Sequence, residues 1–179
     1  MEPRLITEEL TLCACSVEIA RAVGRSRAHA AHLSGFAFHQ DWPDADLPGV
    51  LESYAKLIEA YPDKIGWGVW LFVLNGVVIG DGGFHGPPKD GRVEIGYSIV
   101  PEHQRRGYAT QAVRALCGWA FGNEARLIAA SCVATNLASM RVLERCGFAK
   151  AGSELTQGGQ ARLKWELRPG FQPPPRTGK

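Results

Sequence analysis

Residues 93–110 of this chain read VEIGYSIVPEHQRRGYAT. The first half is rich in Val, Ile and Tyr, which favours a β-strand, and Pro101 ends that strand. A helical pattern begins at Tyr108 and continues to Phe121. The residues between them form a short strand-to-helix loop, and the free N–H groups at the start of such a helix attract anions. We therefore predict a site for a phosphate-containing ligand at this loop.

The composition of the loop fits an anion site. Gly107 permits backbone conformations and a close ligand approach that a Cβ would hinder, and Ala109 keeps the start of the helix small. Arg105 and Arg106 add positive charge. The alternative is a polar turn with two solvated arginines. The nucleotide-hydrolase pattern G-x-x-x-x-G-K-S/T and the dinucleotide pattern G-x-G-x-x-G are both absent from the chain.

On both sides of this stretch, the spacing of apolar residues alternates between the period of a helix, about 3.6 residues, and that of a strand, two residues. Asn75-Gly76 between two β-rich runs predicts a hairpin. The glycines at 80–83 lie inside its second strand and indicate a bulge or close packing. Ser16 is a candidate N-cap. The predicted helices span 16–33, 49–61, 108–121 and 137–146, and the predicted strands span 67–74, 77–84, 92–100, 126–133, 148–153 and 161–167.

This order predicts an α/β (α+β) fold, with a mixed, mostly antiparallel sheet and helices on its faces. At 179 residues the chain has the length of one domain. We predict a single domain over 1–168 and a flexible C-terminal tail over 169–179, since that tail is rich in proline.

Composition argues against several other kinds of protein. A net charge of +2 is too small to indicate nucleic acid or an acidic membrane as a partner. The chain begins without an apolar signal segment and has no run long enough to span a membrane, so we expect a cytoplasmic protein. The five cysteines match no zinc spacing and indicate buried free thiols. No metal site is predicted, because the spacing of His29, His32, His39 and His103 is not that of ligands.

Two motifs carry a resemblance to a known family. Residues 104–109, QRRGYA, resemble the acyl-CoA loop Q/R-x-x-G-x-G/A of the GNAT N-acetyltransferase superfamily. Residues 136–148, NLASMRVLERCGF, resemble its second signature, N-x-x-A/S followed by G-F. The strand residues 94–97 before the loop resemble the branch of ribosomal-protein and related N-terminal acetyltransferases. The resemblance covers about 67–167, and two motifs in this order are more specific than either alone.

The resemblance implies a sheet that splays open between two parallel strands, here 92–100 and 126–133, with acetyl-CoA as co-substrate. The pantetheine arm would pair with the backbone of Ile99 and Val100, and Asn136 would meet it from the other side. The pyrophosphate would lie on Gln104, Arg105, Arg106, Gly107, Tyr108 and Ala109, with Thr110 nearby.

Acyl transfer to an amine by direct attack requires a base, stabilisation of the oxyanion and a proton or hydrogen bond for the leaving thiolate, and it requires no cysteine nucleophile. Glu94 is the candidate base, because it shares a strand face with two small residues. The alternative is a solvated carboxylate or an ion pair with Arg92 or Lys89. Family members often carry a tyrosine acid where this chain has Leu143. Ser139 could instead hydrogen-bond the sulfur, or serve only as a helix cap.

The sequence says least about the acceptor substrate. His85 is a weaker candidate for a base or a substrate contact, and a surface histidine is its alternative. Residues 39–46 combine acids with Trp42 and could attract a cationic amine, or form a turn in which the aspartates cap backbone N–H groups. We therefore predict an acetyl-CoA-dependent N-acetyltransferase for a primary amine on a small molecule or a peptide N-terminus. A non-catalytic acyl-CoA sensor is the alternative function, and the sequence leaves open whether the protein is a homodimer.

Overall fold

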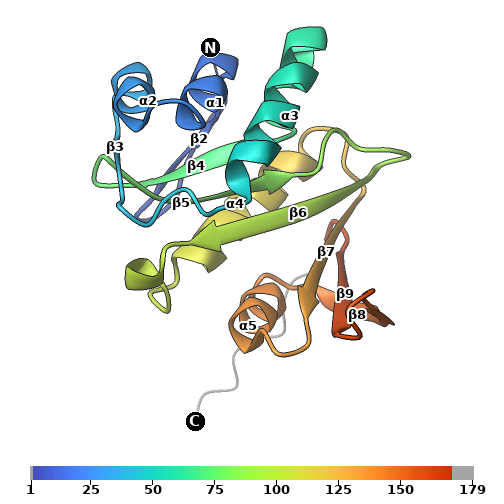
Figure 1. Cartoon of the computed structure of the whole chain (residues 1–179). Coiled ribbons are helices and arrows are strands. Elements are labelled where there is room, and N and C mark those ends of the chain that lie inside the picture. Colours follow the sequence, from blue (N-terminus) through green and yellow to red (C-terminus); the bar gives the residue numbers. More distant parts are fainter. Residues whose placement is uncertain (1, 171–179) are drawn as a thin grey trace.

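The computed structural model of the chain describes residues 2–170, and the predicted tail from residue 171 onward lies outside the described part. One continuous sheet runs through the molecule in the order β1-β2-β4-β5-β6-β7-β9-β8, with β3 added beside β5 (Figure 1). Its strands are β1 (Arg4–Ile6), β2 (Thr11–Ala14), β3 (Ala37–Phe38), β4 (Val69–Leu74), β5 (Val77–Phe84), β6 (Arg92–Ile99), β7 (Leu127–Val133), β8 (Ala149–Leu155) and β9 (Ala161–Leu167). The mixed, mostly antiparallel α/β fold predicted from the sequence is confirmed.

The position of the site follows from the parallel pair β6 and β7. These strands pair only over Arg92–Glu94 and Leu127–Ala129. Beyond that point they diverge, and helix α5 (Leu137–Arg145) lies beside the opening (Figure 1). On its other side β6 stays paired with β5 as far as Ile99. Half of β6 therefore presents one hydrogen-bonding edge that no strand of the described chain covers.

Helices pack on both faces of the sheet (Figure 1). On one side lie α1 (Val17–Val23), α2 (Arg27–Ser34) and α3 (Leu47–Ala60), and on the other lies α4 (Tyr108–Phe121). Two 3-10 turns, η1 (Pro62–Lys64) and η2 (Pro101–His103), complete the elements. No helix in residues 2–170 is both long enough and apolar enough to cross a membrane.

Most predicted elements were within a few residues of the observed bounds, and the first helix was the main exception. One helix was predicted over about 16–33, with Gly24 as a residue that weakens or ends it, and the structure has two helices there. Gly24 ends α1 and the Ser26 side chain caps α2, accepting from the His29 N–H. Ser16 is the N-cap of α1, as predicted, and accepts from the Ile19 N–H.

The glycines of β5 allow a close approach between β5 and β6. A Cβ on Gly82 would lie 2.8 Å from the Gly96 carbonyl oxygen, nearer than packed atoms allow. A register shift at Phe72/Val73 in the neighbouring strand pair adds a bulge. Close packing and a bulge were the two expectations for this glycine run, and both occur.

Candidate active site

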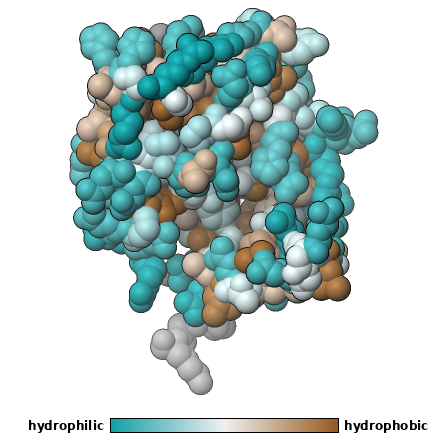
Figure 2. All heavy atoms as spheres, in the orientation of Figure 1, coloured by the Kyte–Doolittle hydropathy of each residue, from teal (hydrophilic) through white to brown (hydrophobic). Residues whose placement is uncertain are grey.

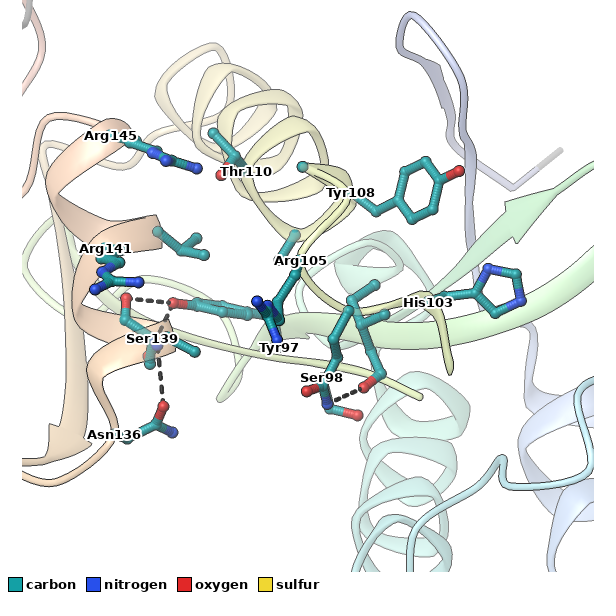
Figure 3. A pocket seen from close by; sticks show the side chains of 16 residues that line it. Tyr97, Ser98, His103, Arg105, Tyr108, Thr110, Asn136, Ser139, Arg141 and Arg145 are labelled. Carbon is teal, nitrogen blue, oxygen red and sulfur yellow. Dashed lines mark hydrogen bonds between the residues drawn. The ribbon is translucent and has the colours of Figure 1, made fainter. Parts of the chain in front are cut away.

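A cavity of about 560 Å³ opens where β6 leaves β7. Its walls come from the end of β6, the loop before α4, the first turn of α4 and one side of α5 (Figure 3). The space-filling view shows the surface hollowed between β6 and α5 (Figure 2). The volume is within the range of about 300–1,000 Å³ that is usual for small-molecule sites.

The loop before α4 has an unusual backbone. Arg105 has φ 64° and Gly107 has φ 90°, both in the left-handed region. A left-handed non-glycine residue costs about 1–3 kcal/mol, and such residues concentrate at functional sites. Gly107 is the N-cap of α4, and no side chain caps this helix. The first intrahelical bond is donated by the Gln111 N–H to the Gly107 carbonyl, so the N–H groups of the preceding helical turn remain available to a ligand.

The charged side chains that line the cavity are positive. Arg105, Arg141 and Arg145 line it, and no aspartate or glutamate does. Within residues 2–170, no carboxylate lies within ion-pair distance of these three arginines. Arg141 and Arg145 were missed in the sequence analysis, although their spacing of four residues places them on one side of a helix. The cavity is therefore suited to a polyanion.

The free edge of β6 can be assigned residue by residue. Val100 donates its N–H to Ile79 O, and Glu94 O accepts from the His85 N–H. Because backbone groups alternate along an antiparallel strand, the even-numbered residues face β5 and the odd-numbered Tyr97 and Ile99 face the opening. Val100 O accepts from the His103 N–H, so both backbone groups of Val100 are occupied. The pairing of Val100 with pantetheine stays a prediction, and Tyr97 and Ile99 are the residues whose backbone groups face the opening.

Ser139 and Tyr97 meet inside the cavity (Figure 3). The two hydroxyl oxygens are 2.9 Å apart. Burial raises the pKa of Tyr97 to about 12, although its hydrogen bond with Ser139 opposes that shift. The Tyr97 side chain is half-buried and packs against the core, and its hydroxyl reaches the cavity. Leu143, at the position of the missing tyrosine, is fully buried.

Asn136 combines a capping role with a place in the cavity wall. Its side chain caps α5 by accepting from the Ser139 N–H at 3.0 Å. Ser139 is therefore not the cap of this helix, and its hydroxyl is free to pair with Tyr97.

Glu94 belongs to the last paired position before the split, opposite Ala129. Its side chain is 42% exposed and accepts from the Ser131 hydroxyl at 3.1 Å. His85 Nδ1 lies 3.8 Å away. The alternative ion pair with Arg92 is not formed, because Arg92 pairs with Glu166 at 2.6 Å. Alternation along β6 places Glu94 on the face opposite Tyr97, so the two candidate catalytic groups approach the split from opposite sides.

The remaining predicted loop residues divide into two groups. Gln104, Ala109 and Thr110 line the cavity, and Gln104 Nε2 donates to Ile99 O at 2.8 Å. Tyr108 also lines it, although its side chain is mostly buried. Arg106 is exposed and is not among the lining residues.

Residues 39–46 form a turn in which an aspartate caps backbone N–H groups, which was one of the two interpretations of this segment. Asp44 Oδ1 accepts from the N–H groups of Asp46 and Leu47 at the start of α3. Trp42 is buried and donates to Asp81 Oδ1 at 2.8 Å. The expectation that the histidines form no metal-like group is wrong for His39, which meets His103 and Glu102 in space.

The cysteine thiols are not arranged for catalysis. Four of the five are buried. Cys146 is partly exposed, but burial raises the pKa of its thiol to about 11. A thiol with a raised pKa is a poor nucleophile at neutral pH.

Comparisons with known proteins agree with this geometry. The family described as Acetyltransferase (GNAT) domain matches residues 21–149. The uncharacterized N-acetyltransferase YjdG of Bacillus subtilis is 28% identical over 148 residues, covering 80% of this chain and 88% of that protein. The ribosomal-protein-S5-alanine acetyltransferase of Vibrio fischeri shares the fold, with a TM-score of 0.70 at 16% identity, over 96% of this chain and 100% of that one. The microcin C7 self-immunity acetyltransferase MccE, solved with acetyl-CoA and AMP, has a TM-score of 0.63 at 15% identity, over 90% of this chain and 93% of that one.

The match covers well over half of the chain, and the split sheet predicted from the two motifs is present. The chain belongs to the GNAT acetyltransferase family.

Proposed function

We propose that the protein transfers the acetyl group of acetyl-CoA to a primary amine by direct attack. The observation that carries the proposal is the arginine-lined cavity, free of acidic residues, between the open edge of β6 and the uncapped start of α4. An anionic ligand with an extended polar arm fits this combination, because phosphates suit the helix start and an amide-containing arm suits the strand edge.

In this proposal the pyrophosphate lies on residues 104–109 and the pantetheine arm pairs with the edge at Tyr97 and Ile99. Arg141 and Arg145 meet the phosphates from α5, because arginine pairs with phosphate through two parallel hydrogen bonds. Asn136 is positioned to contact the arm from the same side, since it lines the cavity at the start of α5.

The chemistry uses both faces of β6. The amine approaches on the side of Glu94, which removes its proton directly or through water. The nitrogen attacks the thioester carbonyl, and backbone N–H groups of the open edge stabilise the oxyanion. The C–S bond then breaks, and the Ser139 hydroxyl, hydrogen-bonded to Tyr97, donates a hydrogen bond or proton to the leaving sulfur. This pair supplies what the buried Leu143 cannot.

The acceptor is either a small-molecule amine or a peptide N-terminus. Ribosomal-protein acetyltransferases share the fold, so a peptide amine is a natural candidate. The half-exposed Glu94 and the exposed His85 leave the acceptor side open to solvent. An open approach of this kind accommodates a peptide end.

The experiment is a thiol-release assay with acetyl-CoA and a panel of amines, including polyamines, aminoglycosides and short peptides with free N-termini. We expect amine-dependent release of CoA with at least one member of the panel. The alternative, an acyl-CoA sensor, predicts acetyl-CoA binding by calorimetry without release above the uncatalysed rate. Absence of both binding and release would refute the site itself.

A further inference from the structure

The structure brings together three metal-ligating side chains at the border of the proposed acetyl-CoA site. His39, Glu102 and His103 each offer one ligand atom, and these atoms lie within 4.8 Å of one another. His39 Nε2 lies 3.0 Å from a Glu102 carboxylate oxygen. The rings of His39 and His103 meet edge to face, with centroids 5.4 Å apart. The site joins two segments that are 63 residues apart in sequence.

We propose that His39, Glu102 and His103 bind a divalent transition metal ion, with Zn²⁺ as the best fit. Two imidazoles and one carboxylate are an established zinc donor set, and a water molecule completes such sites. Imidazole nitrogen disfavours Mg²⁺ and Ca²⁺, which prefer oxygen ligands.

Both histidines are held in place before any ion arrives. The His39 N–H donates to Val78 O, and His39 O accepts from the Trp42 N–H. The His103 N–H donates to Val100 O. The His39 side chain is only 12% exposed. Fixed backbones and a largely buried ring reduce the entropy lost when an ion is bound.

Two further observations point to a missing ligand. His103 Nδ1 is buried and has no hydrogen-bond partner, whereas most buried polar atoms have one. Within residues 2–170, Glu102 has no lysine or arginine within ion-pair distance. The His39 ring is oriented by its neighbour, because the Asp41 backbone N–H donates to His39 Nδ1 at 3.3 Å and leaves Nε2 toward Glu102.

The position gives the ion a structural consequence. Glu102 and His103 belong to η2, directly before the loop 104–109, and His103 also lines the cavity. His39 lies in the connection from β3 to α3. A bound ion would therefore fasten the start of the loop to the connection between β3 and α3.

The test is calorimetric titration of untagged protein with ZnCl₂ in the absence of CoA, whose thiol would compete. We expect one ion per chain. Glu102→Gln and His103→Ala should each weaken binding by more than about 100-fold, since loss of an outer-shell partner alone costs about 10–100-fold. Glu102 is 63% exposed, so Glu102→Gln keeps the test valid if a histidine variant fails to fold. His32→Ala, on α2 and outside the cluster, is the matched control and should bind like wild type.

Cobalt provides a second readout that separates this site from the cysteines. A site of two histidines and one carboxylate gives a Co²⁺ spectrum without thiolate charge-transfer bands. We expect such a spectrum in wild type and its loss in Glu102→Gln. Zinc binding that is unchanged in Glu102→Gln and in folded His103→Ala would overturn the proposal, as would the absence of any binding by wild type.

Discussion

Replacing Gly107 by valine tests the proposed acyl-CoA site most directly. Gly107 has φ 90°, and a Cβ built on it meets no atom within 4 Å. The substitution therefore causes no clash in the free protein, and its effects must come from the backbone or from the space that the ligand occupies. A left-handed conformation costs an L-residue roughly 1–2 kcal/mol, and more when its side chain is β-branched. The loop will relax away from that conformation.

Relaxation moves the N–H groups that Gly107 positions at the start of α4. If acetyl-CoA loses two charge-assisted hydrogen bonds at about 1.5–3 kcal/mol each, its affinity falls by about 10²–10⁴. The loop itself is exposed at Arg105 and Arg106, so the fold should survive with a small loss of stability.

Calorimetry with acetyl-CoA measures the affinity, and thermal melting reports folding. Gly118→Ala is the matched control, because Gly118 lies in the same helix, is exposed, and also has open space around its Cβ. That variant should bind acetyl-CoA like wild type and gain up to about 1 kcal/mol in helix stability. Wild-type affinity in a folded Gly107→Val variant would refute the assignment of the pyrophosphate to this loop.

Three further predictions concern the acid, the base and a buried carboxyl. Glu94→Gln should lower kcat by about 10²–10⁴ while the acetyl-CoA affinity measured by calorimetry stays unchanged; an unaltered pH–rate profile would remove Glu94 from the role of base. Ser139→Ala should lower kcat by about 10²-fold, near the lower end for loss of general-acid assistance, and Tyr97→Phe should lower it by less; full activity in both single variants and in the double variant would show that neither hydroxyl assists the leaving sulfur. Burial raises the pKa of Asp81 from 3.8 to about 7, reinforced by the Asp44 charge and opposed by the Trp42 hydrogen bond. The folded state thus binds more protons than the unfolded state between about pH 4 and 7, so this group lowers stability as pH rises through that window. Asp81→Asn keeps an acceptor for Trp42. Urea unfolding should show that the free energy of unfolding of this variant, relative to wild type, is higher at pH 8 than at pH 5. The same difference between variant and wild type at both pH values would contradict a buried, neutral carboxyl.

The local signals in the sequence were sufficient for much of this structure. Pro101, Gly107 and the apolar spacing of 108–121 fixed a strand, a loop and a helix, because each acts through its own backbone. The first helical segment is divided because Gly24 ends α1 and Ser26 caps α2, and the apolar periodicity of the sequence does not report either effect. Such boundaries are set by single residues rather than by the pattern.

Tertiary contacts explain what the sequence could not show. The Val100 N–H is hydrogen-bonded because the Ile79 carbonyl, on another strand, accepts from it. The pair of Tyr97 and Ser139 depends on α5 lying beside the split. Likewise, His39 and His103 show no ligand spacing in the sequence and meet only after folding.

The divergence of two strands decides how the two halves of the reaction can meet. A fully paired β6 and β7 would separate the face of Glu94 from the face of Tyr97, because a continuous sheet blocks passage between its sides. Pairing between β6 and β7 stops at Glu94 and Ala129. Directly beyond this pair, a chemical group on one face of the sheet can reach the other face. A base at Glu94 therefore stands at the edge of the opening, and the thioester must lie further along β6, toward Tyr97. Moving the carboxylate two residues back along the same face, to position 92, would place it inside the paired region. The double variant Arg92→Glu with Glu94→Gln should consequently fail to recover the activity lost in Glu94→Gln, and recovery would show that the split does not determine where the base must stand.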